Sequence, residues 1–263
     1  MKEIVFLGGG RITSALIAGL RLSKFNKPIV VHDRNSLKLR ELKKLYRIAI
    51  EPDLRRAVDR AHILIIAVRP ASVTPVLNEI GPINRPLVAI SLAAGIPLAK
   101  LRALLGPPVR WVRAMPSPVS RVGHGLTAIA FDRPFPVKRS GEIHSLFQAV
   151  GEVVEIPEDN FDAFTVTYSS SHGYHALATL AKAAVKLGLD EKTAHTAAAH
   201  ALTDGIVAWR GGNTSLTELL NEAATPGGIA AAVMAKMDQA GYQRAIKAGL
   251  EAGLRRARNN ATL

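Results

Sequence analysis

The sequence predicts an α/β half followed by an all-α half, and three observations support this prediction. Short apolar runs alternate with helical segments as far as residue 157 of the 263-residue chain. Some of these runs are continuously apolar, as from Ile63 to Val68, which is typical of parallel strands covered on both faces. After about Glu158 the runs give way to long alanine-rich segments. The predicted domains are therefore residues 1–157 and 158–263.

The first half reads as repeated strand–helix units, the pattern of a doubly wound, Rossmann-like sheet. Its first strand, Ile4 to Leu7, leads into a glycine turn and a helix. The second strand, Pro28 to Asp33, precedes a helix from Leu37 to Tyr46. The other predicted strands are the apolar runs at residues 63–68, 87–91, 109–114, 125–131 and 153–156.

Alanine and leucine, which are strong helix formers, dominate the second half and predict five helices there. These helices cover residues 174–187, 191–209, 216–223, 228–240 and 242–259. Glycine and proline mark the breaks between them, for example at Gly188 and Gly241. Small residues allow close helix packing, so the apolar faces predict a compact bundle or a dimer interface.

Amino-acid composition argues against several kinds of chemistry and partner. The chain has no cysteine, which excludes disulfides and thiolate catalysis and fits a cytoplasmic protein. We expect no secretory leader, because the first apolar run is short and ends in the glycine turn, and no apolar run approaches the ~20 residues of a membrane span. The net charge of +13 is spread along the chain, with one tight cluster from Arg255 to Arg258 and no nucleic-acid motif. We therefore expect no membrane or nucleic-acid partner, and no metal site.

The glycine turn after the first strand predicts a dinucleotide site. Gly8 permits a tight turn, and Gly10 lacks a Cβ, so the backbone can approach a pyrophosphate. The helix that follows, beginning with Arg11 and Ile12, offers free N–H groups and the positive end of its dipole. The third position of the G-x-G-x-x-G pattern is Thr13 rather than glycine or alanine. We expect Gly8, Gly10, Arg11 and Ile12 to contact the dinucleotide.

Further cofactor contacts are expected in the loops at the carboxyl ends of the other strands, where doubly wound sheets bind their ligands. These loops contribute Val68, Arg69, Pro70, Ala93, Ala94 and Gly95. Asp33 and Arg34 end the second strand and point to different coenzymes. A carboxylate at Asp33 favours NAD(H) by binding ribose hydroxyls, whereas Arg34 can accommodate the 2′-phosphate of NADP(H). These residues alone leave both coenzymes open.

Short motifs follow one another along nearly the whole chain. They are A-V-R-P at 67–70, I-S-L-A-A-G-I at 90–96, R-A-M-P at 113–116, V-G-H-G at 122–125, D-x-x-T at 162–165, V-K-L-G-L at 185–189 and T-P-G-G at 225–228. Ser170 and Tyr174 extend the fifth motif. In order and spacing the motifs resemble those of the pyrroline-5-carboxylate reductase family.

The resemblance implies a nucleotide-binding domain, a helical dimerisation domain and an active site between them. It implies an NAD(P)H-dependent oxidoreductase of proline biosynthesis, which reduces the C=N bond of the cyclic imino acid pyrroline-5-carboxylate to give L-proline. The coenzyme favoured by the family and by Arg34 is NADP(H), and the expected partner is a second copy of the chain, as a homodimer or higher homo-oligomer. The implied substrate-binding residues are Ser170, Ser171, Thr225, Gly227 and Gly228.

The motifs on the substrate side depart from the family pattern more than those on the cofactor side. Ile229 and Ala230 stand where the family has mainly hydroxylated residues, and Ser117 replaces an asparagine. The serine loop contains His172, a candidate catalytic proton donor, or else a histidine hydrogen-bonded within a polar loop. Two alternatives therefore stay open: a reductase of another small imine or carbonyl compound, and a non-catalytic NAD(P)-binding dimer.

Overall fold

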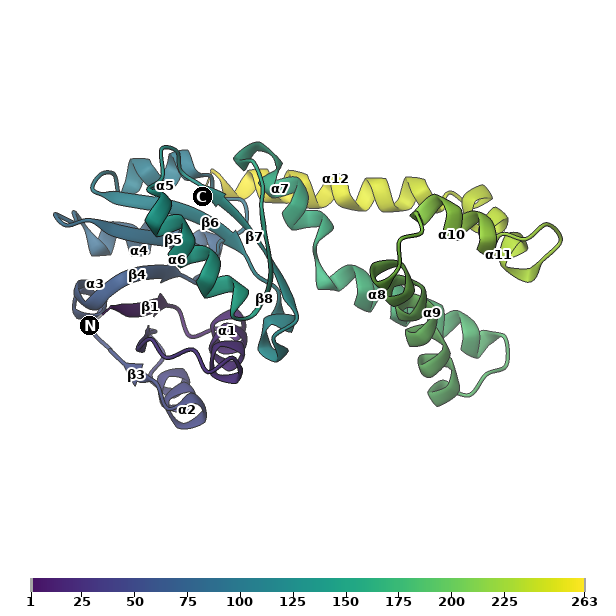
Figure 1. The fold of residues 1–263 in the computed structure, drawn as a ribbon, viewed down its shortest axis with the longest axis horizontal. Coiled ribbons are helices and arrows are strands. Elements are labelled where there is room, and N and C mark those ends of the chain that lie inside the picture. The colour runs from purple at the N-terminus through teal and green to yellow at the C-terminus, as the bar shows by residue number, and fades with distance from the viewer. Residues whose placement is uncertain (1, 263) are drawn as a thin grey trace. The chain divides into compact units, whose positions relative to one another are not determined.

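The computed structural model describes residues 2–262, which form two compact units (Figure 1). The sheet unit comprises the chain up to Thr167 together with the segment from Gly253 onward. The helical unit comprises Tyr168–Ala252. No described helix is both long and apolar enough to cross a bilayer.

The sheet unit is built on one eight-stranded sheet with the order β3-β2-β1-β4-β5-β6-β7-β8. Its strands are β1 (Glu3–Leu7), β2 (Ile29–His32), β3 (Ala49–Ile50), β4 (Ala61–Ile66), β5 (Leu87–Ser91), β6 (Val109–Met115), β7 (Gly125–Phe131) and β8 (Gly151–Glu155). The doubly wound fold class is confirmed, and each predicted strand is present. The short β3 was not predicted.

One strand pair departs from the parallel arrangement. β6 and β7 are antiparallel, with Ala114 opposite Ile129, while the other pairs in the sheet are parallel. Residues 116–124 connect them through only a short 3₁₀ turn, η2 (Pro118–Val122). That connection is too short for the crossover that a parallel pair requires.

Helices cover both faces of the sheet. They are α1 (Arg11–Leu22), α2 (Ser36–Tyr46), α3 (Leu54–Arg60), η1 (Pro70–Ser72), α4 (Val73–Ile80), α5 (Leu98–Leu104) and α6 (Val137–Gln148). Alternate residues of β1 belong to two cores. Ile4 and Phe6 pack in the core that includes Leu16 of α1, and Val5 packs in the core that includes Leu77 of α4. Burial on both faces explains why the strands read as continuous apolar runs.

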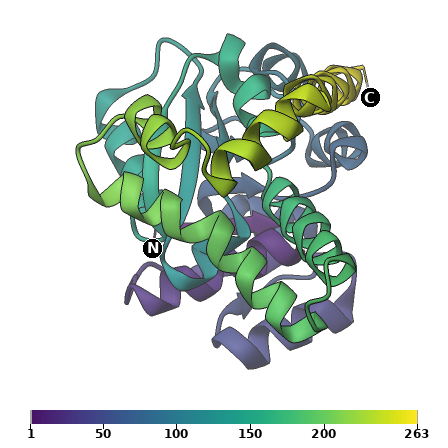
Figure 2. The same ribbon diagram turned by 90° about the vertical axis from the view of Figure 1, so that its right-hand side faces the viewer.

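The remaining elements are helical: α7 (Glu158–Thr167), α8 (Ser170–Lys186), α9 (Glu191–Gly211), α10 (Leu216–Ala223), α11 (Ile229–Gln239) and α12 (Tyr242–Asn260). α8 and α9 pack against each other through Ala181, Ala194 and Ala198, and they lie side by side (Figures 1 and 2). Small side chains at this contact let the two backbones approach. Within residues 156–262 the structure contains no strand, in agreement with the alanine-rich pattern.

Two helical segments beyond residue 157 pack on the sheet unit. In α7, Phe161 is buried against Ala128 and Ala130 of β7. The Arg113 side chain, only 3% exposed, pairs with Glu158 at 3.0 Å and Asp162 at 2.5 Å. Its guanidinium lies 4.3 Å from the centre of the Phe161 ring. The end of strand–helix alternation at residue 157 therefore precedes the end of the compact unit.

The carboxyl-terminal end of α12 is the second such segment. Asn260 donates a hydrogen bond to the carbonyl of Ala94 at 3.1 Å, and Lys100 donates one to the carbonyl of Ala261 at 2.9 Å. Gly95 has φ +77°, and a Cβ there would lie 2.1 Å from the Ala257 carbonyl oxygen. Glycine at position 95 therefore lets the loop after β5 and the last turns of α12 make close contact.

Candidate functional site

A cavity of about 510 Å³ lies at the carboxyl ends of β1, β2 and β4. Because β1 lies between β2 and β4, this is the point where the order of the sheet reverses, the usual ligand site of such folds. The lining residues are Leu7, Gly8, Gly10, His32, Asp33, Arg34, Lys38, Ala67, Val68, Arg69, Ser72, Pro75 and Val76. Six residues predicted to contact the cofactor are thus brought together here: Gly8, Gly10, Asp33, Arg34, Val68 and Arg69.

The glycine turn combines a tight bend at Gly8 with open space at Gly10. Gly8 has φ +106°, and a Cβ there would lie 2.6 Å from the Ala67 carbonyl oxygen, so only glycine fits. A Cβ on Gly10 would meet no protein atom within 4 Å, so the space in front of it is open to a ligand. The buried Thr13 hydroxyl donates to the Gly8 carbonyl at 2.6 Å. Thr13 therefore stabilises the turn at the position where the general pattern has a small residue.

Asp33 is held by the backbone. Its Oδ2 accepts a hydrogen bond from the N–H of Gly9 at 2.7 Å, and its Oδ1 accepts one from the N–H of Asn35 at 2.8 Å. Each carboxylate oxygen thus already binds a donor that fixes the glycine turn or the start of α2. The structure therefore gives Asp33 a positioning role that the sequence did not reveal.

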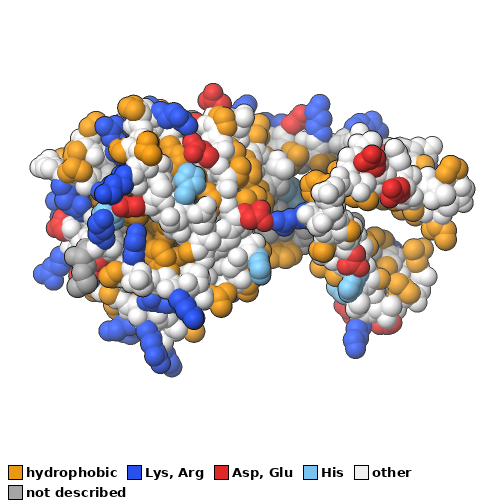
Figure 3. All heavy atoms as spheres, viewed as in Figure 1, with side chains coloured by type: hydrophobic (Ala, Val, Ile, Leu, Met, Phe, Trp, Pro, Cys, Tyr) orange, Lys and Arg blue, Asp and Glu red, His pale blue; other side chains and the backbone are white. Residues whose placement is uncertain are grey.

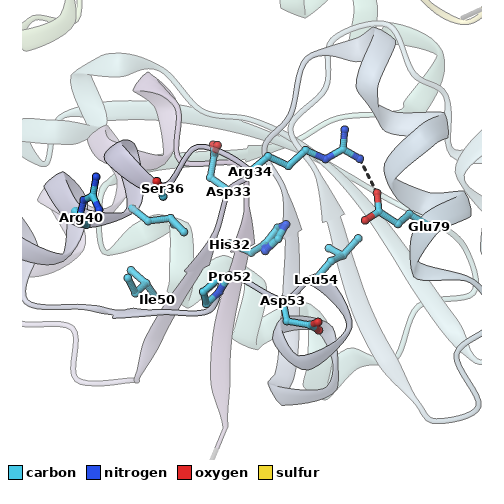
Figure 4. Close-up of a pocket in the computed structure, with 11 residues that line it drawn as sticks. His32, Asp33, Arg34, Ser36, Arg40, Ile50, Pro52, Asp53, Leu54 and Glu79 are labelled. Atoms are coloured by element: carbon cyan, nitrogen blue, oxygen red, sulfur yellow. Dashed lines mark hydrogen bonds and ion pairs between the residues drawn. The ribbon is translucent and has the colours of Figure 1, made fainter.

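A second cavity, of about 370 Å³, shares His32, Asp33 and Arg34 with the first (Figure 4). Its remaining lining residues are Ser36, Leu39, Arg40, Ile50, Pro52, Asp53, Leu54 and Glu79. Arg34 Nη2 pairs with Glu79 Oε2 at 2.5 Å across this cavity. Arg34, Arg40 and the Ser36 hydroxyl supply anion-binding groups on this wall. The face of the sheet unit seen in Figure 3 also carries many lysine and arginine side chains.

The other predicted cofactor residues do not line these cavities. Arg11 and Ile12 begin α1, and Pro70 begins η1. Ala93, Ala94 and Gly95 form the loop after β5, against the end of α12. Lys38 was missed, although a basic residue in the first turn of the helix after Arg34 is a recognisable signal.

The predicted substrate and catalytic residues open two helices of the helical unit. Ser170, Ser171 and His172 form the first turn of α8, where the Ser171 hydroxyl lies 2.7 Å from that of Ser169. Thr225, Gly227 and Gly228 form the turn before α11. Gly227 has φ +77°, and the Gly228 N–H donates to the Thr225 carbonyl at 2.9 Å. The free N–H groups of the first α11 turn are donors suited to a carboxylate.

A cluster of titratable side chains lies elsewhere, where the amino end of β4 meets α6. Glu142 Oε2 accepts hydrogen bonds from His62 at 2.9 Å and Arg139 at 3.0 Å. Burial raises the pKa of Glu142, but these two donors outweigh burial and lower it to about 2. Burial lowers the pKa of His62. The two cavities described above lie at the opposite ends of the strands, so this cluster is separate from the candidate site. Among residues 2–262 no group of three His, Asp or Glu side chains has the geometry of a metal site.

Comparison with known proteins gives two family matches and a set of relatives. Residues 158–260 match the family "Pyrroline-5-carboxylate reductase dimerisation", and residues 3–95 match "NADP oxidoreductase coenzyme F420-dependent". The chain is 30% identical over 260 residues to the pyrroline-5-carboxylate reductase of Synechocystis sp., covering 97% of both. It is 31% identical to that of Corynebacterium melassecola, covering 94% of both.

Solved structures share the fold. The Plasmodium falciparum pyrroline carboxylate reductase with NADP bound superposes with a TM-score of 0.87 at 20% identity, covering 99% of this chain and 98% of that one. The Streptococcus pyogenes 1-pyrroline-5-carboxylate reductase gives a TM-score of 0.89 at 21% identity, covering 98% of both. At these identities the structural likeness concerns the fold alone.

Proposed function

Because the chain belongs to the pyrroline-5-carboxylate reductase family, we propose that it reduces the C=N bond of pyrroline-5-carboxylate with NADPH to give L-proline. The observation that carries this proposal is the similarity to a pyrroline-5-carboxylate reductase over 97% of the chain. The glycine turn supports it, because it lines an open cavity at the point where the strand order of the sheet reverses. NADPH would supply the hydride. The protein has to bind the coenzyme and the imino acid, orient them, and support protonation of the imine nitrogen.

The glycine turn and the start of α1 would hold the pyrophosphate. The open space at Gly10 fits that group, because a phosphate can approach the backbone where no Cβ intervenes. Backbone N–H groups at Arg11 and Ile12 and the helix dipole favour the negative charge. Val68 and Arg69, which follow β4, would form the facing wall of the same cavity.

The arrangement favours NADP(H) over NAD(H). Both oxygens of Asp33 accept backbone hydrogen bonds, so this carboxylate orients the loop whichever coenzyme binds. Arg34 and Lys38 line the cavity and can bind a 2′-phosphate, Arg34 through its planar fork of donors. The Plasmodium falciparum relative, which is crystallised with NADP, supports the same choice.

We assign substrate binding to residues of the helical unit. The N–H groups that open α11 after Gly227 and Gly228 would bind the carboxylate, and the Ser170, Ser171 and Thr225 hydroxyls would add donors. His172 is the candidate proton donor. A protonated imine is already electrophilic, which explains why no nucleophile with an adjacent base is needed. Ile229 and Ala230 favour a second candidate substrate, a more apolar cyclic imine, because they lack the hydroxyls usual in the family.

The protein would act as a homodimer or a higher homo-oligomer. The match of residues 158–260 to a dimerisation family supports this assembly. The buried apolar cluster described between α8 and α9 is small and consists of alanines. Large apolar side chains such as Val207, Ile229 and Val233 are exposed in the helical unit, and Figure 3 shows hydrophobic side chains on its surface. A second copy of the chain would cover such a surface.

The test is turnover with both coenzymes. Purified protein is mixed with NADPH or NADH and either pyrroline-5-carboxylate or a panel of other cyclic imines, and loss of the reduced nicotinamide absorbance is recorded. We expect pyrroline-5-carboxylate and NADPH to be the preferred pair. Preference for an apolar imine would establish the second candidate instead. Coenzyme binding without turnover of any imine would contradict both and indicate a non-catalytic binding protein.

A further inference from the structure

One carboxylate in the smaller cavity, that of Glu79, pairs with a candidate phosphate-binding side chain. Glu79 extends from α4 and pairs with Arg34 at 2.5 Å (Figure 4). Glu79 lines the smaller cavity, and Arg34 lines both cavities. Arg34 is also the residue best suited to bind a 2′-phosphate. Glu79 therefore pairs with the guanidinium that the 2′-phosphate of the coenzyme would bind.

We propose that Glu79 limits the preference for NADP(H) over NAD(H) by competing with the 2′-phosphate for Arg34. This inference rests on the proposed function, since it concerns the coenzyme of that reaction. A 2′-phosphate that binds Arg34 through Nη2 would displace the Glu79 carboxylate from that nitrogen. NAD(H) carries no phosphate at this position and leaves the Arg34–Glu79 pair intact.

The other two acids of this cavity are already engaged in local structure. Asp33 accepts hydrogen bonds from the backbone N–H groups of Gly9 and Asn35. Asp53 caps α3 by accepting a hydrogen bond from the N–H of Arg56 at 2.8 Å. Of the three carboxylates that line this cavity, Glu79 is thus the one whose hydrogen bond goes to a candidate phosphate-binding side chain.

Exposure makes the pair easy to exchange. The Arg34 side chain is 73% exposed and the Glu79 side chain 49% exposed, and ion pairs in such settings are weak. A phosphate, with a charge of about −2 and three acceptor oxygens, can replace one carboxylate on a guanidinium. The displaced Glu79 then faces the phosphate as a like charge. The net effect is a reduced preference for NADP(H), not its exclusion.

The test measures binding, independently of catalysis. Wild-type protein and Glu79→Gln are titrated with NADP⁺, NAD⁺, 2′,5′-ADP and 5′-AMP by calorimetry. We expect Glu79→Gln to bind the two 2′-phosphate ligands about three- to fivefold more tightly, and the other two within about twofold of wild type. The matched control is Glu41→Gln, which removes an exposed carboxylate on α2 that lines neither cavity. This control should leave all four affinities unchanged.

The same titrations in an Arg34→Ala background separate competition from simple repulsion. If Glu79 acts by occupying Arg34, its substitution should gain less than about twofold once Arg34 is absent. The proposal is overturned if Glu79→Gln binds NADP⁺ no more tightly than wild type, if NAD⁺ gains equally, or if the full gain survives without Arg34. Failure of the proposed function is distinguishable, because it leaves coenzyme binding measurable but imine turnover absent. Wild-type protein that binds neither coenzyme would overturn both proposals.

Discussion

At the scale of single residues, the glycines of the first turn have different reasons to be glycine. Gly8 needs its positive φ and has no room for a Cβ, whereas Gly10 has a φ of −78° and open space in front of it. Substitution at Gly8 therefore disturbs the fold itself. Gly10 is the better position for a test of ligand binding, because a side chain added there would clash with a bound ligand and not with the protein.

Gly10→Val should abolish coenzyme binding and leave the fold intact. The added side chain projects into the cavity where the pyrophosphate would lie. Calorimetry with NADP⁺ measures the binding, and circular dichroism monitors the fold. The control is Gly141→Val, at a helical glycine where a Cβ would also meet no protein atom within 4 Å and which lies outside both cavities. Unchanged NADP⁺ affinity in Gly10→Val would remove this turn from the site.

At the scale of elements, buried charge holds α7 to the sheet. Arg113 on β6 lies between two carboxylates of α7 and the Phe161 ring. The sequence shows Arg113 and Asp162 only as separate motif residues. Their pairing depends on β6 and α7 meeting in space, which no local pattern reveals.

Arg113→Met should lower the free energy of unfolding by about 2–4 kcal/mol, because it leaves Glu158 and Asp162 without their shared cation. Glu158 and Asp162 are partly exposed, so the loss of stability is smaller than for a fully buried ion pair. Urea denaturation measures the change. Arg133→Met is the control, since Arg133 pairs with Glu155 while 80% exposed and should cost less than about 1 kcal/mol. Equal losses in the two variants would contradict the account of α7.

The cluster of His62, Arg139 and Glu142 predicts a pH dependence in the acid range. The pKa of Glu142 is lowered from 4.5 to about 2 in the folded protein, so its ionised form stabilises the fold. This contribution, up to about 3 kcal/mol, is fully present above pH ~4.5 and is lost as the pH falls toward ~2. Wild type and Glu142→Gln should therefore differ in unfolding free energy at pH 6, and the difference should shrink below pH ~4.5. A difference in unfolding free energy that stays constant with pH would contradict a stabilising role for ionised Glu142.

The strands and helices that the sequence predicted are those with strong local signals. Continuous apolar runs predict β4 and β5, and alanine-rich stretches predict the helices from α8 onward. The antiparallel direction of β7 was not predicted, because strand direction depends on the connection rather than on the strand's own residues. The same limit applies to the site. The glycine turn is visible in the sequence, but the Arg34–Glu79 pair joins residues from two helix–strand units.

At the scale of the whole molecule, the exposed apolar surface of the helical unit predicts self-association. Apolar side chains such as Val207, 69% exposed on α9, lie on its surface. Sedimentation of the native protein should give a dimer or a larger homo-oligomer. Val207→Glu should weaken association, because burying a charge at an interface is costly. Val137→Glu, at a valine of α6 in the sheet unit that is 86% exposed, is the control and should not. A native monomer at micromolar concentration would contradict the dimer.

Isotope labelling most directly tests whether the protein transfers a hydride from NADPH to the imine carbon of pyrroline-5-carboxylate. The protein is incubated with pyrroline-5-carboxylate and NADPH that carries deuterium at the transferred position, and the product is analysed by mass spectrometry and NMR. The account predicts L-proline with one deuterium on the ring carbon that was double-bonded to nitrogen. Absence of proline, or proline without deuterium at that carbon, would contradict it.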